Sequence, residues 1–138
     1  MNEANERPRF SPHFLVGIEQ IDQEHRQLFE IAGRVYDALA ISDDTANDAI
    51  HAAIAELLHY TATHFSSEEA LMEAAGYPHL EAHKELHSHL LSRARDMEMR
   101  AEIGEPFVAV ELNRFIVNWL SEHILVNDKE FGEFMAAR

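Results

Sequence analysis

The sequence predicts an all-α protein, an up-down-up-down antiparallel four-helix bundle preceded by an irregular N-terminal arm. Apolar residues recur at three- and four-residue steps over four long segments, and connections of only a few residues join these segments. No stretch carries the alternation or turn residues of a hairpin. Because short connections make successive helices antiparallel, residues 1–17 are expected to form the arm and residues 18–138 a single bundle domain.

The first two helices follow the arm. The first is expected from about residue 18 to residue 39, and the second from about 45 to 75, with a polar break at 42–45 that offers N-cap residues. Each carries a stripe of residues for the core: Ile21, Leu28, Ile31, Val35 and Leu39 in the first, and Ile50, Ile54, Leu57, Leu58, Thr61, Phe65 and Met72 in the second.

The last two helices are separated from each other by a Gly-Pro break at 103–106. Gly76 is expected to end the second helix. The third helix is then predicted from about residue 79 to 102 and the fourth from about 107 to 135. Their core stripes are Leu80, Leu86, Leu90, Leu91 and Met97, then Val110, Leu112, Phe115, Ile116, Trp119, Leu120, Ile124 and Phe131.

Composition excludes several classes of protein. The chain has 138 residues, and 25 acidic against 11 basic side chains give a formal net charge of −14. Such a charge argues against nucleic acid or an anionic membrane as partner and favours a dispersed monomer. With no cysteine, disulfides, thiolate metal sites and Cys nucleophiles are excluded. No apolar run approaches 18 residues, and residues 1–10 lack the apolar core of a signal peptide, so a cytoplasmic protein is expected.

Histidine is unusually frequent, with ten residues, and several stand at helical spacings from one another or from a carboxylate. His64 and Glu68 are four residues apart, as are His83 and His87, so each pair lies on one helix face. His25 and His123 follow the phase of the apolar stripes on the first and fourth helices. Each pattern alone is a weak signal.

Together these residues predict a metal site. In the predicted bundle, the starts of helices one and three meet the ends of helices two and four. This places His25, His64, Glu68, His83, His87, His123 and Asp128 in one layer. Buried imidazoles and carboxylates without partners would cost several kcal/mol, a cost that bound metal removes. The seven donors exceed the needs of one ion and suit two, bridged by the carboxylates; by chemistry alone Fe, Zn, Cu or Ni remain open.

Asp128 follows His123 by five residues, a spacing that a regular helix turns by about 140°. The fourth helix is therefore expected to loosen locally, for instance in a π-type turn. The five other histidines are expected at the surface, at the rim of the bundle or in the arm: His13, His51, His59, His79 and His89. Glu69 is expected to face solvent.

At these residues the chain resembles the hemerythrin family in its bacterial single-domain form. The matching order is Ile21-Asp22-x-x-His25, His64-x-x-x-Glu68, His83-x-x-x-His87 and Trp119-Leu120-x-x-His123-x-x-x-x-Asp128, with Gly76-Tyr77-Pro78 before the third helix. The resemblance runs from about residue 14 to 135. One departure lies in the arm, where bacterial members often carry a Trp and this chain reads Phe10-Ser11-Pro12-His13-Phe14.

The resemblance implies a non-haem di-iron protein that binds O2 reversibly as a carrier, store or delivery protein and is not an enzyme. One iron is expected to be held by His83, His87 and His123, and the other by His25 and His64. Glu68, Asp128 and an oxo or hydroxo group would bridge the two ions. The second iron would keep an open position for O2, or for NO or small anions such as azide. The expected pocket residues are Leu28, Phe65, Trp119 and Leu120.

Three alternatives remain open at this stage. A di-iron O2 or redox sensor, or a slow NO- or peroxide-reducing enzyme, would use the same donors. A zinc hydrolase is disfavoured, because the third helix reads His-Lys-Glu-Leu-His and not the His-Glu-x-x-His of zincins. A histidine-rich surface without metal is the last alternative.

Overall fold

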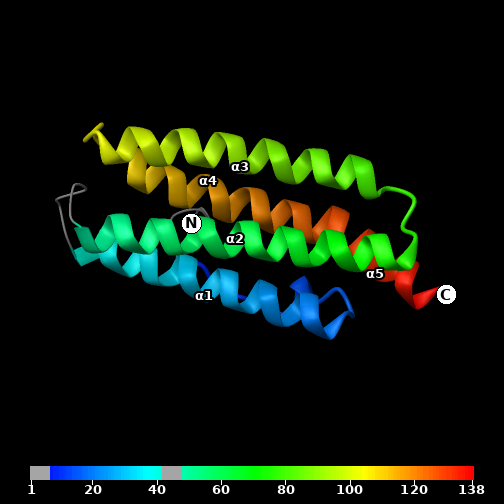
Figure 1. Cartoon of the computed structure of the whole chain (residues 1–138). Helices are drawn as coiled ribbons and strands as arrows, with labels where there is room; N and C mark the ends of the chain where they lie inside the picture. The colour runs from blue at the N-terminus through cyan, green and yellow to red at the C-terminus, as the bar shows by residue number, and fades with distance from the viewer. Residues whose placement is uncertain (1–6, 42–47) are drawn as a thin grey trace.

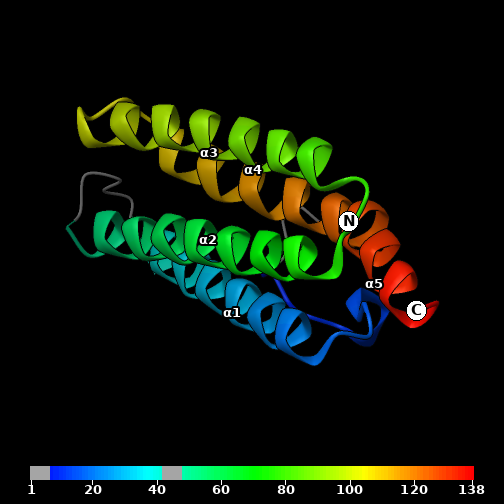
Figure 2. The same cartoon turned by 45° about the vertical axis from the view of Figure 1, so that its right-hand side comes forward.

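The computed structural model describes residues 7–41 and 48–138. Four long helices, α1 (Glu19–Ile41), α2 (Asp48–Ala75), α3 (Leu80–Glu102) and α4 (Val108–His123), run antiparallel to their chain neighbours. Each packs against the next, and α1 also contacts α4, which closes the bundle (Figures 1 and 2). The predicted all-α four-helix bundle is confirmed.

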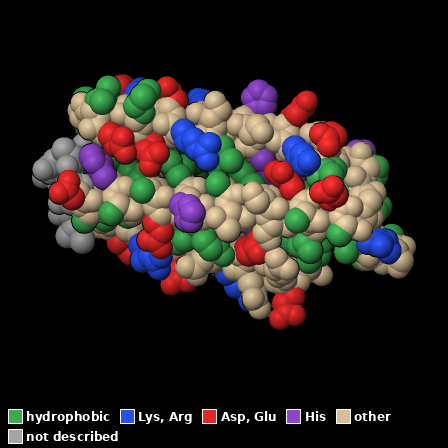
Figure 3. Space-filling view, in the orientation of Figure 1, with side chains coloured by type: hydrophobic (Ala, Val, Ile, Leu, Met, Phe, Trp, Pro, Cys, Tyr) green, Lys and Arg blue, Asp and Glu red, His purple; other side chains and the backbone are tan. Residues whose placement is uncertain are grey.

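The core follows the predicted apolar stripes, because helices with one apolar face are stable when those faces meet. The fully buried side chains include Ile21, Leu28, Ile31, Ile50, Ile54, Leu57, Phe65, Met72, Leu90, Leu112, Ile116 and Phe131. The prediction for Leu86 is wrong: its side chain is 36% exposed. Acidic side chains are spread along the length of the face seen in Figure 3.

The connection between α2 and α3 sets the register of the two helices. Gly76 has a left-handed φ of 68°, which a glycine adopts without a Cβ penalty. The amide of Tyr77 donates to the carbonyl of Met72 at 2.9 Å and closes the helix end. The start of α3 is thereby held beside the end of α2. The N-cap residues predicted at 42–45 lie outside the described residues.

The fourth predicted helix is interrupted. After α4, a π-helical turn spans Ile124–Asp128, and α5 (Lys129–Ala136) completes the helix. This is the local loosening that the spacing of His123 and Asp128 predicts. Because the π turn is wider than an α-helical turn, both side chains can point into the bundle, where they are 4% and 1% exposed.

The last residues of the arm are bound where α1 begins, whereas Arg7 pairs with Asp37 toward the other end of α1. The amides of Val16 and Gly17 donate to the carboxylate of Asp22 at 2.8 and 3.2 Å. The carbonyl of Val16 lies against Gly132 of α5, so closely that a Cβ there would stand 2.1 Å from the oxygen. None of the helices in residues 7–41 and 48–138 has the length and hydrophobicity that a membrane crossing requires.

Candidate metal centre

All seven predicted donor residues meet inside one end of the bundle. His25 comes from α1, His64 and Glu68 from α2, and His83 and His87 from α3. His123 ends α4, and Asp128 ends the π turn. Every one of these side chains is nearly inaccessible to solvent, with exposures of 0–4%.

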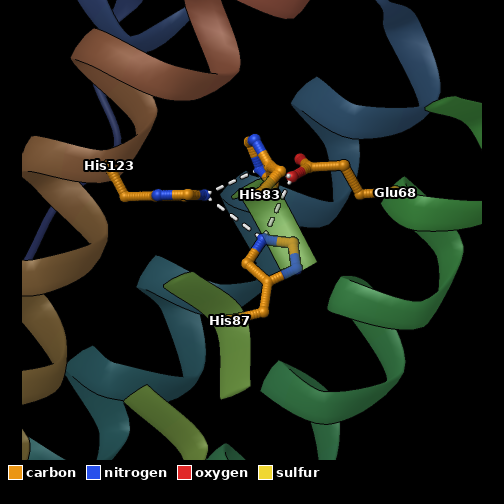
Figure 4. Close-up of side chains that lie close together, drawn as sticks. All are labelled: Glu68, His83, His87 and His123. Atoms are coloured by element: carbon orange, nitrogen blue, oxygen red, sulfur yellow. Dashed lines mark hydrogen bonds and ion pairs between the residues drawn. The ribbon is translucent and has the colours of Figure 1, made fainter. Parts of the chain in front are cut away.

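The donor atoms form two groups that share one carboxylate. In each group the donor atoms lie within 4.8 Å of one another. The first, drawn in Figure 4 with its side chains pointing toward one another, has three histidines and one carboxylate: Glu68, His83, His87 and His123. The second has two histidines and two carboxylates: His25, His64, Glu68 and Asp128.

Glu68 directs one oxygen to each group. Its Oε1 lies 2.7 Å from Nε2 of His83 and 3.3 Å from Nε2 of His87. Its Oε2 lies 3.6 Å from Nε2 of His64 and 3.9 Å from Nε2 of His25. A carboxylate in this position has one donor atom available for each of two ions.

Asp128 has the same two-sided arrangement. Its Oδ1 lies 3.1 Å from Nε2 of His83 and 3.2 Å from Nε2 of His123. Its Oδ2 lies 3.0 Å from Nε2 of His25. The π turn that brings Asp128 into the layer thus supplies a second carboxylate between the two groups.

The donor set fits metal ions better than it fits a protein core. In the described parts of the chain, both nitrogens of His25, Oε2 of Glu68 and both oxygens of Asp128 are buried without a hydrogen bond. In addition, Nε2 of His123 lies 2.9 Å from Nε2 of His83 and 3.2 Å from Nε2 of His87. Neutral imidazole nitrogens so close repel through their lone pairs unless a proton or a cation lies between them. Cations would satisfy these atoms together.

The surroundings of two of the imidazoles, His64 and His87, favour their uncharged form. Burial, together with the neighbouring His83 and His123, lowers the pKa of His87 to about 2. Burial also lowers the pKa of His64, although its hydrogen bond to Glu24 acts in the opposite direction. Neutral imidazole is the form that binds metals, so the fold holds these two side chains ready for coordination.

The two central carboxylates are shifted in opposite directions. Burial and the nearby Asp128 raise the pKa of Glu68 well above its ordinary value. Burial also acts to raise the pKa of Asp128, but the imidazoles of His123, His25 and His83 outweigh it and hold this pKa well below the ordinary value. Two carboxylates so close repel each other when both are ionised, and bound cations would relieve that repulsion.

Two further carboxylates lie outside the donor set. Nδ1 of His64 donates to Oε1 of Glu24 at 2.7 Å, and Nδ1 of His87 donates to Oε2 of Glu69 at 2.7 Å. The prediction that Glu69 faces solvent is therefore wrong, since its side chain is only 25% exposed. Sequence reasoning also missed Glu24. Glu24 directly precedes His25 and Glu69 directly follows Glu68 in the chain, but this adjacency alone does not predict either contact.

Aromatic rings cover the three-histidine group. Phe65 stacks on His87 with ring centroids 3.7 Å apart and planes within 1°. Trp119 stacks on His123 at 4.4 Å and 19°. Of the predicted pocket residues, Leu28, Phe65 and Leu120 are buried, and Trp119 is half-buried. The other histidines belong to neither donor group: His13, His51, His59, His79 and His89.

Comparison with known proteins agrees with this arrangement. The family model described as "Hemerythrin HHE cation binding domain" matches residues 16–134. A bacteriohemerythrin of Stenotrophomonas maltophilia is 34% identical over 122 residues, which are 88% of this chain and 77% of that protein. A bacteriohemerythrin of Clostridium acetobutylicum is 35% identical over 120 residues, covering 86% of this chain and 93% of that protein.

The fold is also similar to solved structures. A crystal structure of wild-type hemerythrin superposes with a TM-score of 0.77 at 29% sequence identity, covering 86% of this chain and 88% of the other. The family match spans most of the chain, and the seven buried donors lie within the matched residues. The chain therefore belongs to the hemerythrin family.

Proposed function

We propose that this chain binds O2 reversibly at a pair of iron ions and acts as an oxygen carrier, store or delivery protein. The names of its relatives, bacteriohemerythrin and hemerythrin, support this proposal. Iron is compatible with the donor set, because imidazole and carboxylate are ligands that iron accepts.

In this proposal the two donor groups each hold one ion. His83, His87 and His123 would hold one iron and His25 and His64 the other, with Glu68 and Asp128 shared between them. The observation that carries the assignment is the two-sided placement of both carboxylates, each with one oxygen toward each histidine set. A single ion at either position would leave one oxygen of each carboxylate facing the other histidine set without a metal.

The unequal number of histidines is expected to leave one ion with a free position. The side that has His25 and His64 offers one imidazole fewer than the other side, so O2 is proposed to bind there. A ferrous pair supplies the electrons that reversible O2 binding uses. Leu28, Phe65, Trp119 and Leu120 are the proposed pocket residues, and their apolar side chains would exclude water from the ion pair and disfavour the escape of charged oxygen species. Of the two aromatic rings, Phe65 also reaches the two-histidine side, with its centroid 5.9 Å from that of His64, whereas Trp119 contacts His123 on the other side.

The experiment is anaerobic reduction of the purified, iron-loaded protein, followed by exposure to air with the visible spectrum recorded. Two irons per chain, with an absorption band that appears in air and fades on deoxygenation, would support reversible O2 binding. Direct conversion to the ferric state without an oxygenated form would reject it and favour the sensor or reductase alternatives. In His25→Ala or His64→Ala, O2 binding should weaken.

A further inference from the structure

Two carboxylates that are not in the donor set each touch one histidine of a different donor group. Glu24 accepts a hydrogen bond from Nδ1 of His64, which belongs to the two-histidine group, and Glu69 accepts one from Nδ1 of His87, which belongs to the three-histidine group. Both bonds are 2.7 Å long, the short distance typical of a charge-assisted hydrogen bond. Each group thus has one histidine whose Nδ1 is hydrogen-bonded to a carboxylate outside the donor set.

The bond at Nδ1 decides what the other ring nitrogen can do. A neutral imidazole carries one proton, and a carboxylate at Nδ1 keeps that proton there. Nε2 is then left with a lone pair, and in both residues Nε2 faces the centre, 3.6 Å from Oε2 of Glu68 for His64 and 3.3 Å from Oε1 for His87. The outer carboxylates therefore fix both the tautomer and the direction of the ring.

The two-histidine group depends on a single such contact. Nδ1 of His25 is buried and has no hydrogen bond within the described residues, so Glu24 is the outer carboxylate that orients an imidazole on this side. Glu24 is itself held, because it accepts hydrogen bonds from Gln20 at 3.1 Å and from Ser67 at 2.9 Å. Gln20 also donates to Ser67 at 2.7 Å. This network joins α1 to α2 around a carboxylate that is 19% exposed.

We propose that Glu24 and Glu69 are positioning residues that act on different metal positions. Glu24 orients His64 at the two-histidine position, and Glu69 orients His87 at the three-histidine position. This rests on the metal pair of the proposed function and deepens it. The consequence is selectivity: loss of Glu24 loosens the ion proposed to bind O2, and loss of Glu69 loosens the other ion.

The first test measures how fast a chelator removes ferrous iron from the anaerobic, iron-loaded protein. Glu24→Ala should release one of its two ions about tenfold faster than the wild type, within the 10- to 100-fold effect typical of outer-shell partners. Glu24→Gln should recover most of the wild-type rate, because its amide oxygen still accepts a hydrogen bond. Glu69→Ala and Glu69→Gln should behave in the same way for the other ion. Glu73→Ala, which removes an exposed carboxylate one turn further along α2, is the matched control.

The second test identifies which histidine has been released. In zinc-loaded, ¹⁵N-labelled protein, NMR should show Nδ1–H protons of His64 and His87 that exchange slowly with water. Glu24→Ala should remove the His64 signal and leave that of His87, and Glu69→Ala should do the reverse. A role limited to helix packing would leave both signals in place.

The outcomes separate the two proposals. If Glu24→Ala and Glu69→Ala release both ions at the rate of Glu73→Ala, the positioning role is rejected while the metal pair stands. If the wild type holds two ions but fails to bind O2, the proposed function fails and the positioning role is still decided by the chelator rates. If the wild type cannot hold two ions, both proposals are wrong.

Discussion

One end of the bundle is filled by five imidazoles and two carboxylates, and the other end is filled mainly by aliphatic side chains such as Val35, Ile54 and Leu112. At the far end, burial itself stabilises the fold, with one exception in Asn113, whose Oδ1 is buried without a partner in the described residues. At the site end, several buried polar atoms have no hydrogen bond, so burial there is unfavourable until ions bind. We infer that the aliphatic end supplies the stability of the bundle, which keeps the unpaired side chains at the other end close together.

The largest effect is expected from Glu68→Leu, which removes the carboxylate shared by both donor groups. Metal affinity should fall more than about 100-fold, beyond the range of outer-shell changes. The free energy of unfolding of the metal-free chain should change by less than about 1 kcal/mol or increase, since an apolar group replaces an unsatisfied buried one. Metal analysis after gel filtration and urea unfolding check both points; two ions per chain in the variant would contradict the bridging role.

The aliphatic end should respond in the opposite way. Leu112→Ala removes a fully buried side chain and should lower the free energy of unfolding by about 2–5 kcal/mol. Below the unfolding transition, the variant should still hold two ions. Leu86→Ala is the matched control, because its side chain is exposed and its loss should cost about 0.5 kcal/mol. Metal loss from folded Leu112→Ala would show that the two ends are not independent.

Two glycines, Gly132 and Gly33, allow a neighbouring group to approach the helix backbone closely, and their substitution by alanine should have different effects. Gly132→Ala should lower the free energy of unfolding by about 1–3 kcal/mol, because its Cβ would stand 2.1 Å from the backbone oxygen of Val16. In Gly33→Ala the Cβ would instead meet the guanidinium of Arg7 at 2.8 Å. That end of a flexible side chain can move, and alanine favours the helix. Thermal unfolding of Gly33→Ala should therefore match or exceed the wild type; equal losses in both variants would refute the steric argument.

The smallest effect is the pH dependence of the metal-free chain. The pKa of His87 is lowered from 6.5 to about 2 in the folded protein, so between these values the unfolded chain binds more protons. The contribution of His87 to stability is therefore complete above pH 6.5 and decreases as the pH falls, by up to about 2 kcal/mol between pH 7 and 5, whereas the raised pKa of Glu68 acts in the opposite direction. Urea unfolding at both pH values measures it. His87→Gln should reduce the dependence; an unchanged slope would exclude His87 as its source.

The position of the site along the bundle axis could be predicted from the sequence, because helix topology and residue spacing determine it. Once four antiparallel helices are assigned, residues early in α1 and α3 must meet residues late in α2 and α4. The exposure of Leu86 was also within reach, since the buried series on α3 runs through His83, His87 and Leu90, and Leu86 lies about 100° away from His87.

The outer carboxylates could not be predicted from spacing. Glu24 and Glu69 lie next to predicted donor residues in the chain and therefore about 100° from them around the helix. Their side chains reach sideways to a histidine on the neighbouring helix, as the bonds to His64 and His87 show. Such contacts depend on interhelical distance and rotamer, which the sequence pattern does not encode.

The π turn has a consequence for insertions and deletions in this chain. It contains one residue more than the α-helical turn it replaces. Deleting the exposed Val126 would restore a continuous helix and put the aspartate four residues after His123, the spacing of the other donor pairs. Phe131 and Gly132 would still follow the aspartate by three and four residues, so the face of α5 that meets Tyr77 and Val16 would keep its direction. In this turn the fourth helix can therefore lose one residue without changing how α5 docks, whereas a deletion within the regular turns of α4 would rotate everything after it by about 100°.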